Sequence, residues 1–298
     1  MTDQNIQPDD VPGGVVVGVD GSDNAEHALA WAVAKTERLG PVLPIMTFTT
    51  PTSVTSIGLA LSTDPAMFRQ AAETRLAEIL DKVDPSLTPN ARVIEGHAGV
   101  ALCQAAEKAE LLVVGTRGVG ALMGSLTGST SIYCAKHSTA PVIIVPENFP
   151  SDRPLRNVVV GIDGSENADA ALRWAIAHME PDGRIAAVGA FPPWGYINGN
   201  FDPPREVMEA HVRERVEDSV ARVVGTLEDG PEIEIHVATR DAREALRRLA
   251  GLKVDMLVVG SRGESGLSFL FLGSVATALA HHPKVPTVIV PGLDRNKK

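Results

Sequence analysis

The sequence predicts an α/β protein made of two doubly wound domains, each built on a five-stranded parallel sheet. Three observations predict this fold. The 298 residues are enough for about two domains of ordinary size. The second half of the chain repeats the first. Within each half, short apolar runs alternate with helical segments, which is the pattern of parallel βαβ units.

The repeat is long enough to be a duplicated domain. Residues 15–35 and 158–178 are identical at 14 of 21 positions, and LLVVGTRG at 111–118 returns as MLVVGSRG at 256–263. The offset of 143 to 145 residues is far longer than the repeat of a solenoid. We therefore expect the following organisation: a flexible tail at 1–13, a first domain at 14–147, a linker at 148–156, a second domain at 157–292 and a flexible tail at 293–298.

The first repeat opens with a β-branched run, Val15–Val19, which predicts the first strand. A helix is expected from Asp23 to Leu39, with Ser22 as its N-cap and Gly40 after its end. Apolar residues recur on one face of this helix.

The other elements follow in order, and the second repeat has the same order. They are expected to be a strand at 43–48, a helix at 64–83, a strand at 91–95, a helix at 100–109, a strand at 111–114, a helix from 128 and a last strand at 142–145. All strands are apolar throughout, as a sheet covered on both faces requires. Pro44 is expected to interrupt the second strand.

Composition excludes several classes of function. With 27 Lys and Arg against 37 Asp and Glu, the net charge of −10 argues against sequence-independent nucleic-acid binding. The N-terminus does not resemble a signal peptide, and no apolar run is long enough to cross a membrane, so we expect a cytoplasmic protein. Cys103 and Cys134 are interpreted as small buried residues, and no metal site is expected.

A glycine-rich loop follows the fourth strand of each repeat with the spacing G-x2-G-x9-G-S. Its residues are Gly115, Thr116, Arg117, Gly118, Gly128 and Ser129 in the first repeat, and Gly260, Ser261, Arg262, Gly263, Gly273 and Ser274 in the second. Glycines let a phosphate approach backbone amides, and the helix that starts at the end of the loop offers unpaired N–H groups. The arginines add positive charge. We interpret both loops as anion cradles, because a surface loop without function would not need the same spacing twice.

Other nucleotide motifs are missing. A Walker A loop needs Gly-Lys, which occurs nowhere, and the turn after the first strand reads Gly-Val-Asp-Gly-Ser instead of a dinucleotide fingerprint. Asp20 and Asp163 end the first strands, where they would either contact a nucleotide or cap a helix. Phe48 and Phe191 end the second strands, where flanking an adenine ring and closing the core are equally good interpretations.

These motifs together resemble the universal stress protein family in tandem form. The resemblance rests on VVVGVDGS and VVVGIDGS, on both glycine-rich loops and on the terminal PVIIVP and PTVIVP. The loop spacing is typical of the branch of the family that binds ATP. The resemblance implies strand order 3-2-1-4-5 and ATP across the ends of strands 1 and 4. The implied contacts are Gly18, Asp20, Phe48, residues 115–118, Gly128, Ser129 and Thr130, and then Gly161, Asp163, Phe191, residues 260–263, Gly273, Ser274 and Val275.

The same resemblance implies a regulatory protein of the stress response with one ATP site per domain and no catalytic residue. A slow ATPase or phosphotransferase, and an interaction module without nucleotide, stay open as alternatives. So do a preference for AMP or a cyclic nucleotide and the presence of Mg²⁺ beside the phosphates. The family further implies that the two domains pair through their last strands, that two chains form a dimer, and that an unknown protein partner is regulated. Thr130 against Val275 is expected to make the two sites differ.

Overall fold

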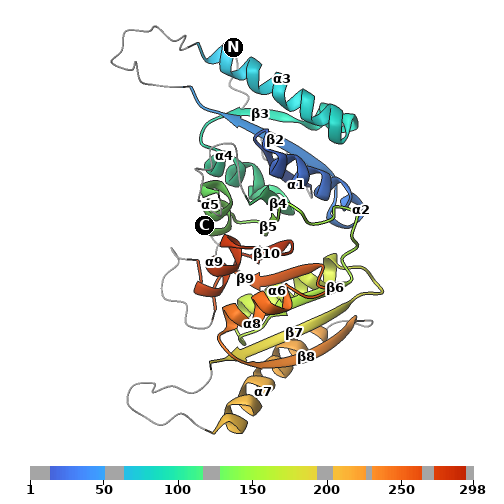
Figure 1. Cartoon of the computed structure of the whole chain (residues 1–298), viewed down its shortest axis with the longest axis vertical. Coiled ribbons are helices and arrows are strands. Elements are labelled where there is room, and N and C mark those ends of the chain that lie inside the picture. Colours follow the sequence, from blue (N-terminus) through green and yellow to red (C-terminus); the bar gives the residue numbers. More distant parts are fainter. Residues whose placement is uncertain are drawn as a thin grey trace, which may run out of the picture.

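The computed structural model describes residues 14–50, 64–116, 128–192, 204–225, 230–263 and 272–292. Its strands form one continuous ten-stranded sheet in the order β3-β2-β1-β4-β5-β10-β9-β6-β7-β8 (Figure 1). Each repeat contributes five parallel strands in the predicted local order. The two five-stranded sheets are not separate, because the last strands of the two repeats pair with each other and join them.

The first repeat, residues 14–147, contains the predicted elements with small shifts. They are β1 (Val15–Val19), α1 (Asp23–Val33), α2 (Thr36–Leu39), β2 (Val42–Phe48), α3 (Pro65–Val83), a 3₁₀ turn (Pro85–Asn90), β3 (Arg92–Glu95), α4 (Ala98–Ala105), a second 3₁₀ turn (Ala106–Lys108), β4 (Leu111–Gly115), α5 (Ser129–His137) and β5 (Val142–Val145).

The second repeat, residues 157–292, has the same order of strands and longer helices, and its described residues include no counterpart of α2 or of the two 3₁₀ turns. Its elements are β6 (Asn157–Gly161), α6 (Glu166–His178), β7 (Arg184–Phe191), α7 (Arg205–Val224), β8 (Glu232–Thr239), α8 (Ala242–Leu249), β9 (Met256–Gly260), α9 (Ser274–His281) and β10 (Thr287–Val290). The tails expected at 1–13 and 293–298 lie outside the described residues.

Two local expectations in the first repeat were wrong. The helix expected at 23–39 breaks after Val33, where the Thr36 hydroxyl donates a hydrogen bond to the Val33 carbonyl and offers that group an alternative to the helical pattern. Pro44 does not interrupt β2. Its register partner is Val17 of β1, whereas the pairing with β3 begins only at Ile45. The proline therefore lies where β2 has a single neighbour.

The helices cover both faces of the sheet. On one face α1 packs against α3, and α6 packs against α7. On the other face α4 contacts α5, α5 contacts α9, and α9 contacts α8, so this row of helices runs across both repeats (Figure 1). None of the helices in the described ranges is long and apolar enough to span a bilayer.

The joint between the repeats is an antiparallel pairing of β5 and β10. Thr287 pairs with Ile144, Val288 with Ile143 and Ile289 with Val142. All four residues of β5 are at most 1% exposed. An unpaired strand edge attracts a partner, and here each repeat covers the apolar edge of the other.

The segment between the repeats is held by polar contacts as well. The buried Lys35 ammonium donates a hydrogen bond to the Ser151 carbonyl at 2.6 Å, and His27 Nε2 lies 2.6 Å from the Phe149 carbonyl oxygen. Burial lowers the pKa of Lys35, while the nearby carboxylates of Asp152, Glu180 and Asp255 act in the opposite direction. The linker is therefore fixed against α1.

Asp255 organises the start of β6. Its buried Oδ2 accepts hydrogen bonds from the backbone N–H groups of Arg156 and Asn157 at 3.1 and 2.7 Å and from Asn157 Nδ2 at 3.1 Å. Its other oxygen forms an ion pair with Arg153. One carboxylate thus ties the linker to the second repeat.

We predict that Asp255→Ala lowers the free energy of unfolding by about 3 kcal/mol, because it removes a buried charge and leaves several donors unpaired. Urea unfolding followed by circular dichroism measures this loss. The matched control is Asp182→Ala. Asp182 also pairs with Arg156, at 3.1 Å, but its side chain is 66% exposed, so the loss should stay below about 0.5 kcal/mol. Equal losses for the two variants would contradict this role of Asp255.

Candidate functional site

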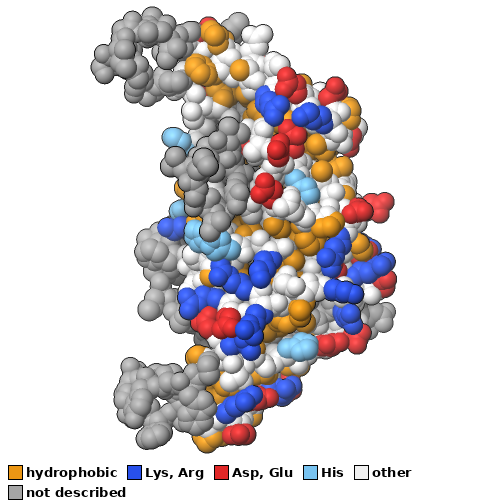
Figure 2. Space-filling model, in the orientation of Figure 1, with side chains coloured by type: hydrophobic (Ala, Val, Ile, Leu, Met, Phe, Trp, Pro, Cys, Tyr) orange, Lys and Arg blue, Asp and Glu red, His pale blue; other side chains and the backbone are white. Residues whose placement is uncertain are grey.

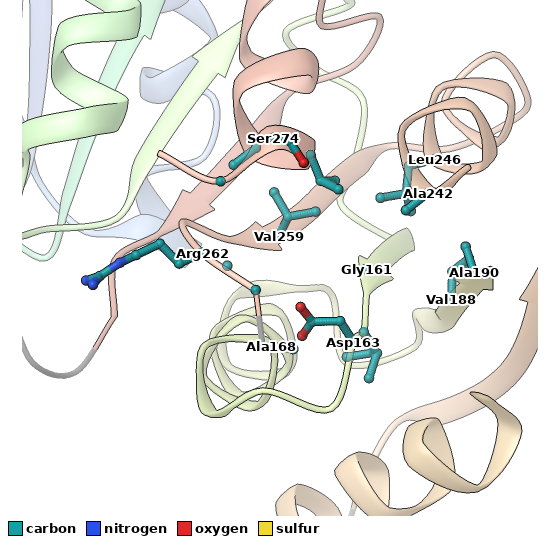
Figure 3. Close-up of a pocket in the computed structure, with 16 residues that line it drawn as sticks. Gly161, Asp163, Ala168, Val188, Ala190, Ala242, Leu246, Val259, Arg262 and Ser274 are labelled. Carbon is teal, nitrogen blue, oxygen red and sulfur yellow. The ribbon is translucent and has the colours of Figure 1, made fainter. Parts of the chain in front are cut away.

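A pocket lies beyond the carboxyl ends of β6 and β9 in the second repeat (Figure 3). It has about 780 Å³ of empty space, counting the part open to solvent. This position is where doubly wound sheets bind their ligands. The described residues that line it are Gly161, Ile162, Asp163, Ala168, Val188, Ala190, Ala242, Leu246, Val259, Gly260, Arg262, Gly263, Gly273, Ser274, Val275 and Ala276.

The turn between β6 and α6 forms one side of the pocket. Asp163 Oδ1 accepts hydrogen bonds from the Ser165 amide at 3.1 Å and the Ser165 hydroxyl at 2.6 Å. The Ser165 hydroxyl in turn caps α6 by accepting from the Ala168 N–H. Gly164 between them has φ of +86°, a conformation that favours glycine. Asp163 therefore helps to build the helix cap and also faces the pocket.

The first repeat has the same turn. Asp20 Oδ1 accepts from the Ser22 amide and hydroxyl at 3.0 and 2.7 Å, and Ser22 caps α1. Gly21 has φ of +85°. Both aspartates thus help to cap the first helix of their repeat. For Asp163 this role is compatible with a contact to a ligand, because the residue also lines the pocket.

The ends of each glycine-rich loop are brought together by one backbone hydrogen bond. Gly273 N–H donates to the Ser261 carbonyl at 2.8 Å, and Gly128 N–H donates to the Thr116 carbonyl at 2.6 Å. In the second repeat, a Cβ on Gly263 would collide with Asp163 Oδ2. The loop backbone and the turn after β6 are therefore in direct contact. Arg117 and Gly118 lie outside the described residues.

The helices that begin at these loops have no side-chain cap. Gly128 is the N-cap of α5 and Gly273 is the N-cap of α9, and neither offers an oxygen to the first turn. In contrast, α1 and α6 are capped by serines. The N-terminus of α9, with Ser274 as its first residue, borders the pocket (Figure 3). Such an end favours an anion.

Four of the predicted glycines have a packing role. A Cβ on Gly18 would lie 2.7 Å from Leu102 Cδ1, and one on Gly161 would lie 3.1 Å from Leu246 Cδ1. A Cβ on Gly115 would lie 2.5 Å from Asn24 Oδ1, and one on Gly260 would lie 2.8 Å from Asn167 Cβ. Because they have no Cβ, these glycines let the helices approach the strand ends. This packing role does not depend on whether the glycines also contact a ligand.

Several predicted site residues are buried or point away from the pocket of the second repeat, and others in the first repeat contact side chains of the protein itself. Phe191 and Ser261 are buried and are not among its lining residues. The Arg262 backbone borders the pocket, but its guanidinium extends away from Asp163 and from α8 (Figure 3). In the first repeat, the buried Thr116 hydroxyl donates to Asn24 Oδ1 at 3.0 Å, and Arg69 lies over the Phe48 ring at 5.3 Å.

Sequence reasoning missed the apolar wall of the pocket. Val188 and Ala190 come from β7, and Ala242 and Leu246 come from the first turns of α8. A signal was present, because a helix that starts after the third strand begins at the carboxyl edge of the sheet. The wall gives the pocket one apolar end and one polar end.

Known proteins match the chain along nearly its whole length. The profile of the Universal stress protein family matches residues 14–146 and again residues 154–291. The chain is 28% identical to universal stress protein Rv1996 of Mycobacterium tuberculosis, over 93% of this chain and 94% of that protein. It is 27% identical to a universal stress protein of Mycolicibacterium smegmatis, over 93% and 96%.

A solved structure has the same fold. The crystal structure of a universal stress protein from Archaeoglobus fulgidus aligns with a TM-score of 0.65 at 18% identity, covering 94% of this chain and 98% of that one. The likeness extends over both repeats and their joint. The chain belongs to the universal stress protein family and carries two copies of its domain in tandem.

Proposed function

We propose that this protein binds ATP in each repeat and uses the bound nucleotide to regulate a partner in the stress response. The single observation that carries the proposal is the two-ended pocket of the second repeat. The wall formed by Val188, Ala190, Ala242 and Leu246 suits a nucleobase, and the uncapped start of α9 suits phosphates.

The polar groups between these two ends support a nucleoside. Asp163 is the single carboxylate among the described residues that line the pocket, and its Oδ2 lies against the loop at Gly263. A carboxylate at this place is suited to accept hydrogen bonds from ribose hydroxyls. In this arrangement the base packs on apolar side chains, the ribose hydroxyls donate to a carboxylate, and the phosphates accept from backbone N–H groups.

The charge distribution also supports an anionic ligand. Although the chain carries a net charge of −10, Lys and Arg side chains gather over the second repeat on the face shown in Figure 2. Helix α8, which borders the pocket, carries Arg243, Arg247 and Arg248. Local positive charge raises the concentration of anions near a site even when the whole protein is acidic.

The first repeat supports a second site. It shares the Asp-Gly-Ser turn, the closed loop ends and the uncapped helix start at Gly128. Thr130 takes the place of Val275, and the Ser131 hydroxyl, bonded to the Gly128 carbonyl at 3.0 Å, takes the place of Ala276. The two sites are proposed to hold the same nucleotide with different phosphate contacts.

Regulation fits this pocket better than catalysis does. Its described lining contains no histidine, lysine or cysteine that would act as an acid or base. A bound nucleotide changes a protein's conformation or assembly only if it binds the alternative states unequally. A dimer of chains, a regulated protein partner and a cytoplasmic location belong to the same proposal, and Mg²⁺ would enter with the phosphates.

We predict that the purified protein carries two ATP molecules per chain. The protein is denatured, and the released nucleotide is identified and counted by chromatography. Added ATP is then titrated into nucleotide-free protein. Absence of nucleotide together with failure to bind added ATP would refute the proposal, and recovery of ADP alone would favour an ATPase. Recovery of AMP or a cyclic nucleotide would change the identity of the ligand.

We predict that Gly263→Ala weakens one of the two sites, because the new Cβ would displace the Asp163 carboxylate or the loop. Calorimetric titration should show one site unchanged and one weakened by about tenfold or more, which corresponds to about 1.4 kcal/mol. The control is Gly230→Ala, whose Cβ would meet only Val224 Cγ1 at 3.3 Å, far from the pocket lining. Two unchanged sites in the Gly263 variant would contradict the assignment of the loop.

A further inference from the structure

The two cysteines of the chain lie together in the first repeat. Cys103 is on α4 and partly exposed, Cys134 is on α5 and buried, and their thiols are hydrogen-bonded to each other. The interpretation of both as small buried residues fits Cys134 and does not explain why the second thiol lies beside it.

The backbones of α4 and α5 approach closely at this place. A Cβ on Gly99 would lie 3.1 Å from Tyr133 Cβ and 2.6 Å from Tyr133 Cδ1. Cys103 is one helical turn beyond Gly99, and Cys134 follows Tyr133. A disulfide needs Cβ atoms about 3.5–4.5 Å apart. The close packing of α4 and α5 at this place is consistent with the contact between the Cys103 and Cys134 thiols, on which a disulfide would form.

In the second repeat, different side chains make the contact between the corresponding helices, α8 and α9. Helices α4 and α8 begin and end at positions 144 residues apart, which places Arg247 where the first repeat has Cys103. The Arg247 guanidinium donates a hydrogen bond to the Ala278 carbonyl of α9 at 3.0 Å. Leu279 stands where the first repeat has Cys134. The thiol pair is thus particular to the first repeat.

The contact between α4 and α5 lies beside the candidate site of the first repeat. Leu102, the neighbour of Cys103, packs against Gly18 at the end of β1. Cys134 lies on the helix whose first residue, Ser129, follows the glycine-rich loop. A covalent link between α4 and α5 would therefore fix Leu102 and the end of β1 relative to the start of α5.

We propose that Cys103 and Cys134 form a reversible intramolecular disulfide that changes ligand affinity at the site of the first repeat. The bond itself stands on the geometry of the two helices. Its effect on affinity rests on the proposed nucleotide-binding function.

The oxidant is a peroxide such as H₂O₂. The sulfur of Cys103, the more accessible thiol, attacks one peroxide oxygen; the O–O bond breaks, the thiol proton joins the departing hydroxide as water, and Cys103 becomes a sulfenic acid. The sulfur of Cys134 then attacks the sulfenic sulfur, the S–O bond breaks, and the hydroxide leaves as water with the Cys134 proton. Two thiols and one peroxide thus give one disulfide and two waters, and a dithiol reverses the bond by exchange.

The order of the two steps follows from the environment. The hydrogen bond with Cys103 and burial both raise the pKa of the Cys134 thiol. Since the thiolate is the nucleophile, Cys134 is the poorer first attacker. Its role in the second step rests on position, because its sulfur is in contact with Cys103.

The bond is tested by treating the reduced full-length chain with H₂O₂, alkylating the remaining thiols under denaturing conditions, and mapping the peptides without reduction. The expected result is a loss of both thiols, a mass lower by two hydrogen atoms, and one peptide pair that links residues 103 and 134 within a chain. Dithiothreitol should restore both thiols. Cys103→Ser, at a partly exposed position, and Cys134→Ala should each abolish the linked pair. Sulfinic or sulfonic acid at Cys103 with Cys134 still alkylated, or a link between two chains, would overturn the disulfide.

The effect on the site is measured in the Gly263→Ala background, in which the weakened second site is resolved from the tighter binding to the first repeat. Calorimetric titration should show an affinity change of about fivefold or more between the reduced and oxidised proteins, and no change for Cys103→Ser treated alike. A linked peptide pair without a change in affinity would overturn the coupling. Failure of both forms to bind ATP would refute the nucleotide function and the coupling that rests on it, while the peptide map would still decide on the disulfide.

Discussion

The antiparallel pairing of β5 with β10 is the contact on which the arrangement of the whole chain depends. Each strand is a largely apolar edge that would leave backbone groups unpaired if its repeat stood alone. Pairing removes both edges at once and fixes the repeats relative to each other. It also brings α5 against α9, so that the two helices that start at the glycine-rich loops lie in contact. The two candidate sites are therefore mechanically connected through the joint.

Glycine has two different functions around the site, and only the structure separates them. Gly18, Gly115, Gly161 and Gly260 lie at strand ends where a Cβ would strike a neighbouring helix, so they set the distance between strand and helix. Gly128 and Gly273 instead leave a helix start without a side-chain cap. The first group builds the crevice, and the second leaves amide groups available in it. A motif of regularly spaced glycines thus combines packing requirements with binding requirements.

The two repeats differ at several positions where their helices meet the candidate sites. Thr116 holds Asn24 through its hydroxyl, whereas the equivalent Asn167 donates to the Arg262 carbonyl instead. Cys103 and Cys134 occupy a junction that Arg247 ties by a hydrogen bond in the other repeat. Both repeats keep the Asp-Gly-Ser turn and contribute a strand to the β5–β10 pairing. The differences named here therefore concern the residues around the candidate sites. Such differences allow one repeat to respond to conditions that leave the other unaffected.

The sequence by itself determined the duplication, the Ser22 cap of α1 and the position of the glycine-rich loops, because these follow from local patterns of apolar residues, glycines and capping groups. It also indicated that the last strands are exposed edges. The strand order within each repeat was implied by the family resemblance. Only the tertiary structure decided the register in which the last strands join the sheets, that Pro44 stays inside β2, and that Val188, Ala190 and Leu246 line the pocket that the start of α9 also borders. The physical reason is that these features depend on which distant segments become neighbours. Register with a second strand, the direction of the Arg262 guanidinium and the contact between two thiols are set by packing across the fold, which local sequence patterns do not encode.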